Sequence, residues 1–215
     1  MARRNSRKLA ILAKIENIYA TDPTPTGALN AILAINAQLT PMEGKEVSRD
    51  LLYPYLGNPG IILAGIYATL EFSVEVAGAG AAGTAPKWGV LHRACRWAET
   101  LNAGVSAVYS PVSSSLESAT LYFNMDGVNH ILLGARGTWT REYVPQEIPR
   151  WRYKFTGLLG TIADVALPAT TLTAFVKPVI VNKANTIVQL HGLTAITERL
   201  NIDCGNQVEP RLLVG

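Results

Sequence analysis

The residues of this chain whose types and spacing could do chemistry begin with a glycine-rich run. The segment Gly78–Gly83 spaces its glycines as G-x-G-x-x-G, which can bring backbone amides close to a dinucleotide pyrophosphate at a helix start. However, Glu71 and Glu75 alternate along the strand expected before it, whereas the first strand of a dinucleotide-binding domain is nearly all apolar. Pro86 also delays the following helix. We therefore prefer a connecting loop and keep a nucleotide-binding enzyme as an alternative.

Patterns for metal binding and nucleophilic catalysis are incomplete. His92 and Cys95 lie three positions apart on an expected helix and could share a metal ion. The residues that could complete the site, His191, Asp203 and Cys204, are far along the chain. Cys95 falls on the apolar side of that helix, so a buried core thiol is preferred. No serine lies in the G-x-S-x-G frame of a hydrolase. The sequence therefore predicts no catalytic residue, no cofactor and no metal site, and hence a protein that is not an enzyme.

Two groups of basic residues could contact nucleic acid. Arg150, Arg152 and Lys154 alternate with aromatic residues, which places the three charges on one side of a strand. Pairing with Glu142 and Glu147 across a hairpin is the competing explanation. The other group is N-terminal and consists of Arg3, Arg4, Arg7 and Lys8. Without it the net charge of +3 falls to about neutral, so no general basic field predicts tight nucleic-acid binding.

The composition predicts a globular chain. Its 215 residues, 48% hydrophobic and 16% charged, suit one domain and exclude a disordered protein. Two cysteines are too few for a disulfide framework and fit a reducing compartment. Lys14 and Glu16 interrupt the apolar residues that a signal peptide would need. The uncharged stretch 51–70 has turn residues in its middle, so we expect two short buried segments and a soluble protein without a membrane span.

One strand and one helix can be placed with clear patterns. Residues 67–76 alternate apolar and polar side chains, which predicts a half-buried strand with Glu71, Ser73 and Glu75 on its wet face. Pro86 opens the helix, which the apolar spacing extends over about 86–101.

Hairpins and further short strands account for the remaining elements. The Asp126-Gly127 pair predicts a hairpin turn, and a second hairpin joins 138–144 to 150–156. Further strands are expected at 105–109, 170–176, 179–181, 187–191 and 196–202. This pattern predicts a mainly β fold, a β-sandwich or barrel-forming sheet with one packed helix and an extended N-terminal arm.

The first sixty residues differ from the rest in pattern. They combine a basic tip, a Pro/Thr-rich segment and brief apolar patches, which favours an arm with long loops. We expect residues 1–60 to form this arm as part of the same domain, and residues 61–215 to form the β-sandwich.

Short sequence segments spread over nearly the whole chain resemble those of a known protein family. They lie at residues 10–16, 53–56, 67–86, 109–114, 133–138, 155–157, 167–168, 171–175 and 181–186, together with the Asp126-Gly127 hairpin. In these segments the chain resembles the tail tube (major tail) proteins of long flexible-tailed, siphovirus-type bacteriophages. It departs from that family at its end, where relatives continue with further strands. Either a sheet edge is left open here, or the C-terminus is naturally short.

The resemblance implies a structural role in a virion. Tail tube proteins form homo-hexameric rings whose central strands join into one barrel, and the rings stack into a non-contractile, helical tube. The tube encloses the tape measure protein, meets tail terminator and distal tail proteins at its ends, and conducts double-stranded DNA into the host without sequence-specific binding. The protein would be made and assembled in the host bacterial cytoplasm and would not contact a membrane. A tail-tip or neck ring protein of the same fold is the alternative.

The same resemblance suggests which residues serve these roles. A conduit should not retain DNA, so neutral or acidic side chains are expected to face the lumen, with Glu71, Ser73 and Glu75 as candidates. This expectation fails if Arg150, Arg152 and Lys154 face the lumen. The candidates for contacts between subunits or rings are Arg3, Arg4, Arg7, Lys8, Ile11, Tyr53, Tyr55, Gly78, Gly80 and Gly83.

Overall fold

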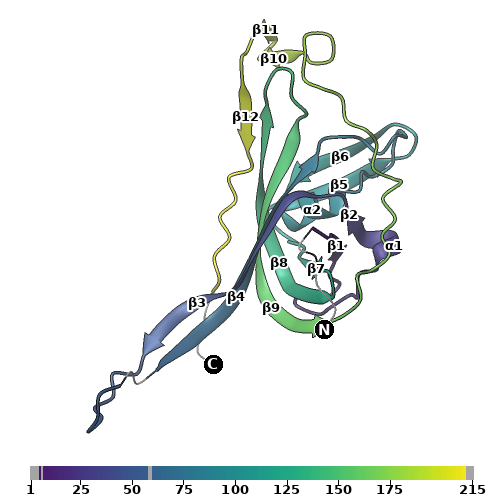
Figure 1. The fold of residues 1–215 in the computed structure, drawn as a ribbon. Helices are drawn as coiled ribbons and strands as arrows, with labels where there is room; N and C mark the ends of the chain where they lie inside the picture. The colour runs from purple at the N-terminus through teal and green to yellow at the C-terminus, as the bar shows by residue number, and fades with distance from the viewer. Residues whose placement is uncertain (1–4, 6, 58–59, 212–215) are drawn as a thin grey trace.

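A computed structural model describes residues 5, 7–57 and 60–211 of the chain. Its strands are β1 (Leu9–Ile15), β2 (Ala31–Ile32), β3 (Ile35–Ser48), β4 (Ile61–Glu75), β5 (Trp97–Asn102), β6 (Ser106–Pro111), β7 (Ala119–Met125), β8 (Val128–Tyr143), β9 (Arg150–Asp164), β10 (Val188–Leu190), β11 (Leu193–Ala195) and β12 (Leu200–Asp203). Its helices are α1 (Gly27–Asn30) and α2 (Gly89–Ala94). The mainly β prediction is confirmed (Figure 1).

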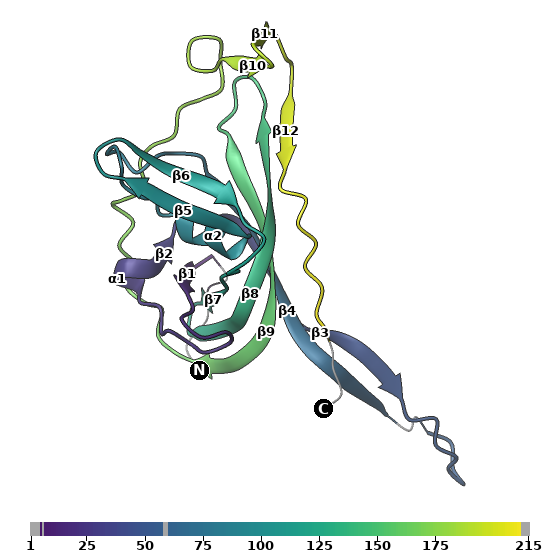
Figure 2. The same cartoon turned by 180° about the vertical axis from the view of Figure 1, so that it is seen from behind.

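One antiparallel sheet organises the molecule. Its strands run in the order β2-β1-β7-β8-β9-β4-β3, and β12 pairs with the end of β8 that β7 does not cover. The long strands β8 and β9 curve, so that one end of the sheet carries β7 and β1 while the other carries β4 and β3 (Figures 1 and 2). The β5–β6 hairpin is separate from this sheet and lies beside α2, and a small β10–β11 hairpin lies near the turn between β8 and β9.

The core lies between the sheet and α2. The predicted alternation along β4 is confirmed, because Leu70, Phe72 and Val74 are each at most 3% exposed and pack with Tyr153 and Phe155 of β9. Both predicted hairpins are also present, one between β7 and β8 and the other between β8 and β9. Gly127 has a φ of +98°, which a tight hairpin turn needs and glycine adopts without steric cost.

The predicted helix over 86–101 is mostly wrong. Helix α2 spans Gly89–Ala94, and residues 97–102 form strand β5 instead. Arg96 has a φ of +69°, a left-handed conformation that stops the helix, and β5 then pairs with β6 along its whole length. Helical spacing of apolar residues was therefore overridden by hairpin pairing in this stretch.

The strands predicted near the C-terminus are also partly wrong. Residues 170–176 and 179–181 contain no strand. Within or beside the other two predicted segments only the short strands β10, β11 and β12 occur. Apolar residues here are largely exposed rather than buried in a sheet. A short apolar run does not by itself specify a strand when no neighbouring strand is present to pair with it.

Strand β1 belongs to the body of the fold, although its sequence lies within the expected arm. It pairs with β2 on one side and β7 on the other. Ile11 is 3% exposed and packs in the core, which corrects the expectation that its side chain contacts a neighbouring subunit. Three consecutive apolar residues on a strand between two others are required by the core and are not free for an external contact.

A buried carboxylate follows β1 and ties it to two neighbouring strands. Glu16 accepts hydrogen bonds from the hydroxyls of Ser118 and Thr120, each at 2.6 Å, and from the backbone N–H groups of Gly134 at 2.7 Å and Ala20 at 2.9 Å. Burial alone would raise the pKa of Glu16, but these four bonds to the charged form outweigh it and lower the pKa below its usual range. The carboxylate is therefore ionised and fully bonded in the folded protein.

Candidate functional site

The face of the sheet opposite α2 is polar and carries both signs of charge. The register of β4 and β9 sets Glu71 opposite Lys154 and Glu75 opposite Arg150, while Arg152 lies opposite Ser73. Strand β8 continues these rows with Thr138, Thr140 and Glu142. We call these nine residues of β4, β9 and β8 the polar face.

This register corrects the expected separation of acidic and basic residues. Residues directly opposite each other in an antiparallel pair point to the same side of a sheet. Arg150, Arg152 and Lys154 form the basic stripe of β9. This stripe therefore faces the same surface as Glu71, Ser73 and Glu75. A neutral or acidic surface formed by β4 alone does not exist in this fold. The sequence could not reveal this, because β9 pairs with β4 as well as with its hairpin partner β8.

Ion pairs between strands neutralise much of the basic stripe. The Lys154 ammonium lies 2.9 Å from a Glu71 oxygen, and this bond raises the pKa of Lys154. Arg152 lies 3.0 Å from Glu142, which also contacts Arg199. The predicted pairing of the basic stripe with acidic residues across the hairpin is thus confirmed for Glu142. Glu147 instead lies in the loop after β8, where its backbone carbonyl accepts a hydrogen bond from the N–H of residue 181. The polar face is close to charge balance.

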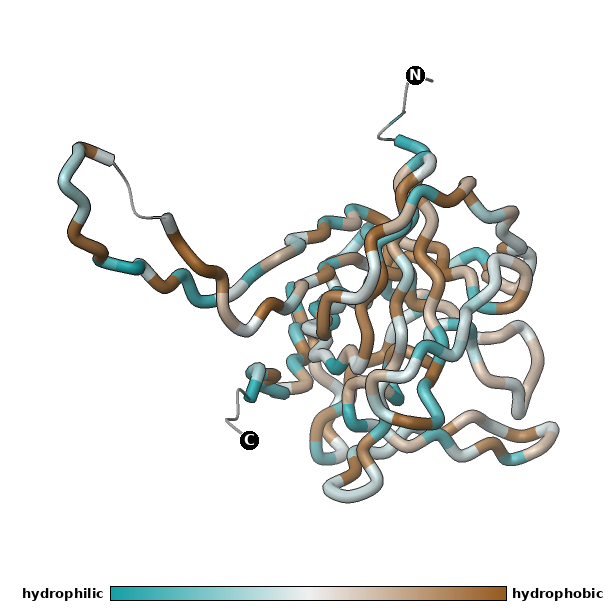
Figure 3. The backbone as a smooth tube through the Cα atoms, turned by 90° about the horizontal axis from the view of Figure 1, so that it is seen from below, coloured by the Kyte–Doolittle hydropathy of each residue, from teal (hydrophilic) through white to brown (hydrophobic). Residues whose placement is uncertain are grey.

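A long hairpin projects from the body and exposes apolar side chains. It comprises the outer halves of β3 and β4 with the described part of the connection between them, residues 45–57 and 60–66, and we call it the apolar arm (Figures 1 and 3). Leu52 and Leu56 are fully exposed, and the rings of Tyr53 and Tyr55 stack on each other with their centroids 5.0 Å apart. The other exposed apolar residues of the arm are Val47, Leu51, Ile61, Ile62 and Ile66. An exposed apolar surface of this kind is typical of a protein–protein contact.

Among the described residues the sheet has three outer edges that no further strand covers, and the shortest is the outer side of the two-residue strand β2. Another is the outer side of β3, a fourteen-residue strand that pairs only with β4. The third is the outer side of β12, which is four residues long. A long uncovered edge presents unpaired backbone N–H and C=O groups and is a template for pairing with another chain.

The remaining predicted contact residues are distributed between the N-terminus and the glycine run. Arg3 and Arg4 lie outside the described residues. Arg7 and Lys8 are exposed, and the Lys8 ammonium is 4.0 Å from Asp126.

The glycine run is a loop, as preferred from the sequence. Around Gly78 there is open space, whereas Gly80 approaches Val176. A Cβ on Gly83 would lie 2.4 Å from the Asn102 carbonyl oxygen, so this glycine packs against the β5–β6 turn of the same chain. Helix α2 starts only at Gly89. The glycine amides therefore do not run directly into a helix start, as a pyrophosphate site requires.

His92 is a core residue surrounded by aromatic rings. It is 2% exposed and packs against Trp88, Trp139 and Trp151. The Tyr153 hydroxyl lies 2.8 Å from its Nδ1. Burial, with a smaller contribution from the nearby positive charge of Arg141, lowers the pKa of His92 to about 3. The imidazole is therefore neutral and structural in this protein.

The two cysteines lie near this aromatic cluster. Cys95 is fully buried, and burial raises the pKa of its thiol. Cys204 accepts a hydrogen bond from the Trp97 indole at 3.4 Å. Within residues 5, 7–57 and 60–211, no three His, Cys, Asp or Glu side chains come together as a metal site would need.

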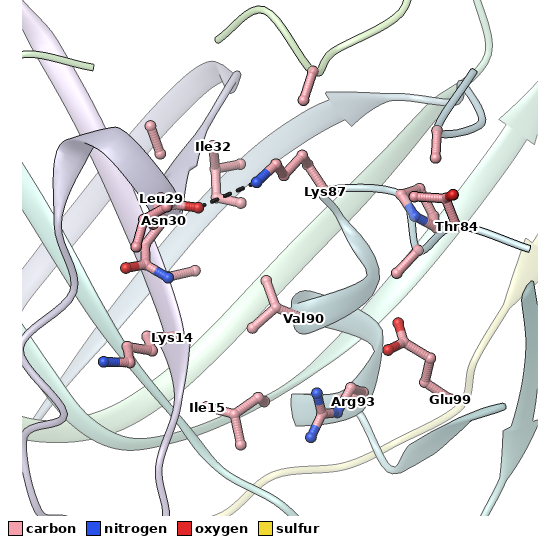
Figure 4. A pocket seen from close by; sticks show the side chains of 16 residues that line it. Lys14, Ile15, Leu29, Asn30, Ile32, Thr84, Lys87, Val90, Arg93 and Glu99 are labelled. Atoms are coloured by element: carbon pink, nitrogen blue, oxygen red, sulfur yellow. Dashed lines mark hydrogen bonds between the residues drawn. The ribbon is translucent and has the colours of Figure 1, made fainter. Parts of the chain in front are cut away.

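A surface pocket lies between β1, α1 and α2 (Figure 4). The cations that line it are already engaged with protein groups. Lys14 donates to the Pro23 carbonyl at 2.7 Å, and Arg93 forms a two-point pair with Glu117 at 2.5 and 2.7 Å. Lys87 donates to the Leu29 carbonyl at 3.3 Å. The pocket is therefore lined by satisfied structural contacts.

None of the helices described is both long and apolar enough to cross a membrane. No protein-family model matches the sequence, and no curated protein matches it.

Two solved structures are similar in fold. One is a chain of the anti-feeding prophage cap, the tube-terminating cap, with 10% identity and a TM-score of 0.45 over 77% of this chain and 93% of that chain. The other is a chain of the six-fold symmetrised anti-feeding prophage baseplate, with 10% identity and a TM-score of 0.42 over 78% of this chain and 98% of that chain. At 10% identity these matches indicate a similar fold and nothing further.

Proposed function

We propose that this chain is a structural virion protein whose copies form hexameric rings, and that these rings stack into the non-contractile tail tube of a bacteriophage. The observation that carries the proposal is a sheet with a long uncovered β3 edge and a projecting apolar arm. Both features are costly for an isolated protein and are useful when copies of the chain cover them. The family resemblance of the sequence supports the same role.

The dimensions of such a ring suit the passage of DNA. Strands β3, β4, β9 and β8 form four adjacent strands in each subunit. Six subunits would supply about 24 strands, which at a spacing of about 4.8 Å and a tilt of about 40° give a barrel about 48 Å in diameter. Side chains projecting inward by about 5 Å leave a lumen a little under 40 Å wide, against about 20 Å for the DNA duplex.

The polar face is the surface of the subunit that we assign to the lumen. Its arginines and lysine would attract phosphates if they stood alone, but Glu71 and Glu142 hold two of them in ion pairs. DNA in transit would therefore meet a surface close to charge balance and release few counterions. In this proposal the tape measure protein occupies the lumen first, and terminator and distal tail proteins close the ends of the tube.

Electron microscopy of the purified chain over a range of concentrations tests this function. We expect rings at moderate concentration and tubes at high concentration, with sedimentation velocity reporting the matching masses. Rings that never stack would favour a tail-tip or neck ring protein. A protein that stays monomeric at every concentration would contradict assembly, and binding of a nicotinamide dinucleotide in a calorimetric titration would favour the enzyme alternative.

A further inference from the structure

Residues 199–206 cover the edge of β8 between Gly137 and Tyr143. We call these residues the guard segment. Its strand β12 pairs with the last four residues of β8, and the Cys204 N–H then donates to the Trp139 carbonyl at 3.0 Å. The Asn206 side-chain amide reaches the Gly137 carbonyl at 3.4 Å. Figures 1 and 2 show β12 alongside β8 at the margin of the sheet.

The guard segment is attached more weakly than the other neighbour of β8. Strand β12 has four residues, whereas β9 on the opposite side of β8 has fifteen. Asn201 and Asp203 are exposed, and Ile202 is half-buried against the core. Short segments with few buried apolar contacts open at low free-energy cost. The guard segment can therefore leave while the rest of the sheet stays folded.

The directions of the strands show what fits this edge in a ring. Adjacent strands alternate in direction across β3, β4, β9, β8 and β12, so β12 runs in the same direction as β3. Rotation about a ring axis keeps strand directions, so the β3 strand of the next copy would run antiparallel to β8. If β12 stayed in place, the incoming β3 would instead lie parallel to it, in a sheet that is otherwise antiparallel. Parallel pairing is the less stable arrangement.

We propose that the β8 edge is the receiving surface for the β3 strand of a second copy, and that the guard segment holds this edge until the second copy displaces it. This rests on the proposed ring assembly. Strand β12 has the direction of β3 and covers the edge that the ring needs, so it protects the subunit from premature pairing. The displaced segment is short and none of its residues is fully buried. Its departure breaks the core contacts of Ile202 and Cys204, the bond from the Asn206 amide to the Cys95 carbonyl at 2.6 Å, and the Arg199–Glu142 ion pair.

A reversible disulfide between β12 and β8 tests the proposal. Because Cys204 and Trp139 form a hydrogen-bonded pair, the alternation makes Asp203 and Thr140 a non-hydrogen-bonded pair with close Cα atoms, which a disulfide can bridge. Asp203→Cys and Thr140→Cys are introduced together into a Cys204→Ser parent, whose hydroxyl can still accept the bond from Trp97. Circular dichroism and mass spectrometry confirm the fold and the disulfide before assembly is measured.

We expect the oxidised variant to stay monomeric at concentrations where the parent forms rings, and to assemble as the parent does once it is reduced. If the oxidised form assembles as well as the reduced form, the guard proposal is overturned and the proposed function stands. If the parent itself forms no rings at any concentration, both are overturned.

Weakening the attachment of the guard segment to β8 should have the opposite effect to the disulfide and make assembly easier. Ile202→Ser removes the apolar anchor of β12 and should lower the concentration needed for assembly by about fivefold. An unchanged or higher concentration threshold for assembly would count against the guard proposal.

The barrel diameter in a cryo-EM reconstruction adds a third readout, because four strands per subunit give about 48 Å and a retained fifth strand would give about 60 Å.

Discussion

Glu71 and Lys154 face each other across β4 and β9, and their charged groups lie 2.9 Å apart. This pair shows that the acidic and basic residues of the sheet share one face and neutralise each other. A surface built in this way can lie beside a polyanion without binding it tightly, since a cation already held by a carboxylate releases fewer counterions to a phosphate.

Removing the carboxylates of the polar face should make it bind DNA. In the double variant Glu71→Gln/Glu142→Gln, the basic stripe loses its partners, and we expect double-stranded DNA to bind at low salt and to dissociate as salt rises. Fluorescence anisotropy with a labelled duplex measures this. The matched control Glu71→Gln/Lys154→Gln removes one charge of each sign and should behave like the unmodified protein. Equal DNA binding by the two double variants would contradict the role assigned to the ion pairs.

Glu16 should contribute strongly to stability through the four hydrogen bonds that it accepts. Glu16→Gln replaces one acceptor oxygen with a donor amide, so at least one of the donors from Ser118, Thr120, Gly134 or Ala20 is left without a partner. We expect a loss of about 2–3 kcal/mol in the free energy of unfolding at pH 7, measured by urea denaturation. Because folding lowers the pKa of Glu16, its contribution is complete above its unfolded pKa and falls as pH drops through the lowered value. A change below about 0.5 kcal/mol would argue against this bonding.

His92 should make stability depend on pH in the mildly acidic range. Its folded pKa of about 3 lies below the ordinary value of 6.5, so between these values the unfolded chain binds a proton that the folded protein does not. Its contribution is complete above pH 6.5 and falls by at most about 1.4 kcal/mol per pH unit as pH drops toward 3. Urea unfolding at several pH values compares the unmodified protein with His92→Phe/Tyr153→Phe, which removes both ends of the buried hydrogen bond. The double variant should show a shallower pH dependence, and parallel curves would contradict the assignment.

The apolar arm should serve assembly and contribute little to folding. Ser48 and Ile61 pair across the hairpin, so residues 49–60 can be replaced by an Asn-Gly turn that closes the same two strands. We expect the free energy of unfolding to change by less than about 1 kcal/mol, while tubes disappear from electron micrographs.

A milder change to the arm provides its matched control. Leu52→Ser/Leu56→Ser removes two fully exposed apolar side chains from the arm, and Val105→Ser removes one that is 74% exposed on the β5–β6 turn. The arm variant should lose tube formation and the Val105 variant should keep it. Equal effects of the two would indicate a general response to surface polarity.

Local patterns in the sequence predicted the parts of the fold that depend on neighbouring residues. Alternation along β4 and the Asp126-Gly127 turn gave correct strands and hairpins because side-chain burial and turn geometry are set within a few residues. The helix over 86–101 failed at Arg96, where a left-handed backbone and pairing with β6 decide the structure. No local pattern carries that information.

The candidate site was predicted less well, because it depends on register between distant strands. The sequence placed Glu71, Ser73 and Glu75 on one face, but pairing of β4 with β9 added the basic stripe to it. Ile11 was expected to contact a neighbouring subunit because residues 1–60 were expected to form an arm, but β1 lies in the sheet and the Ile11 side chain is buried. A strand was predicted at 196–202, which overlaps β12, but the sequence did not reveal that this strand pairs with β8.

Amide hydrogen exchange along β3 tests most directly whether copies of the chain complete the sheet. In the isolated subunit the amides of Ile35–Ser48 that point away from β4 lie on an uncovered edge and should exchange rapidly. In assembled particles we predict that those same amides become strongly protected, while the already paired amides of β9 change little. Rapid exchange of the outer β3 amides in fully assembled particles would contradict the account.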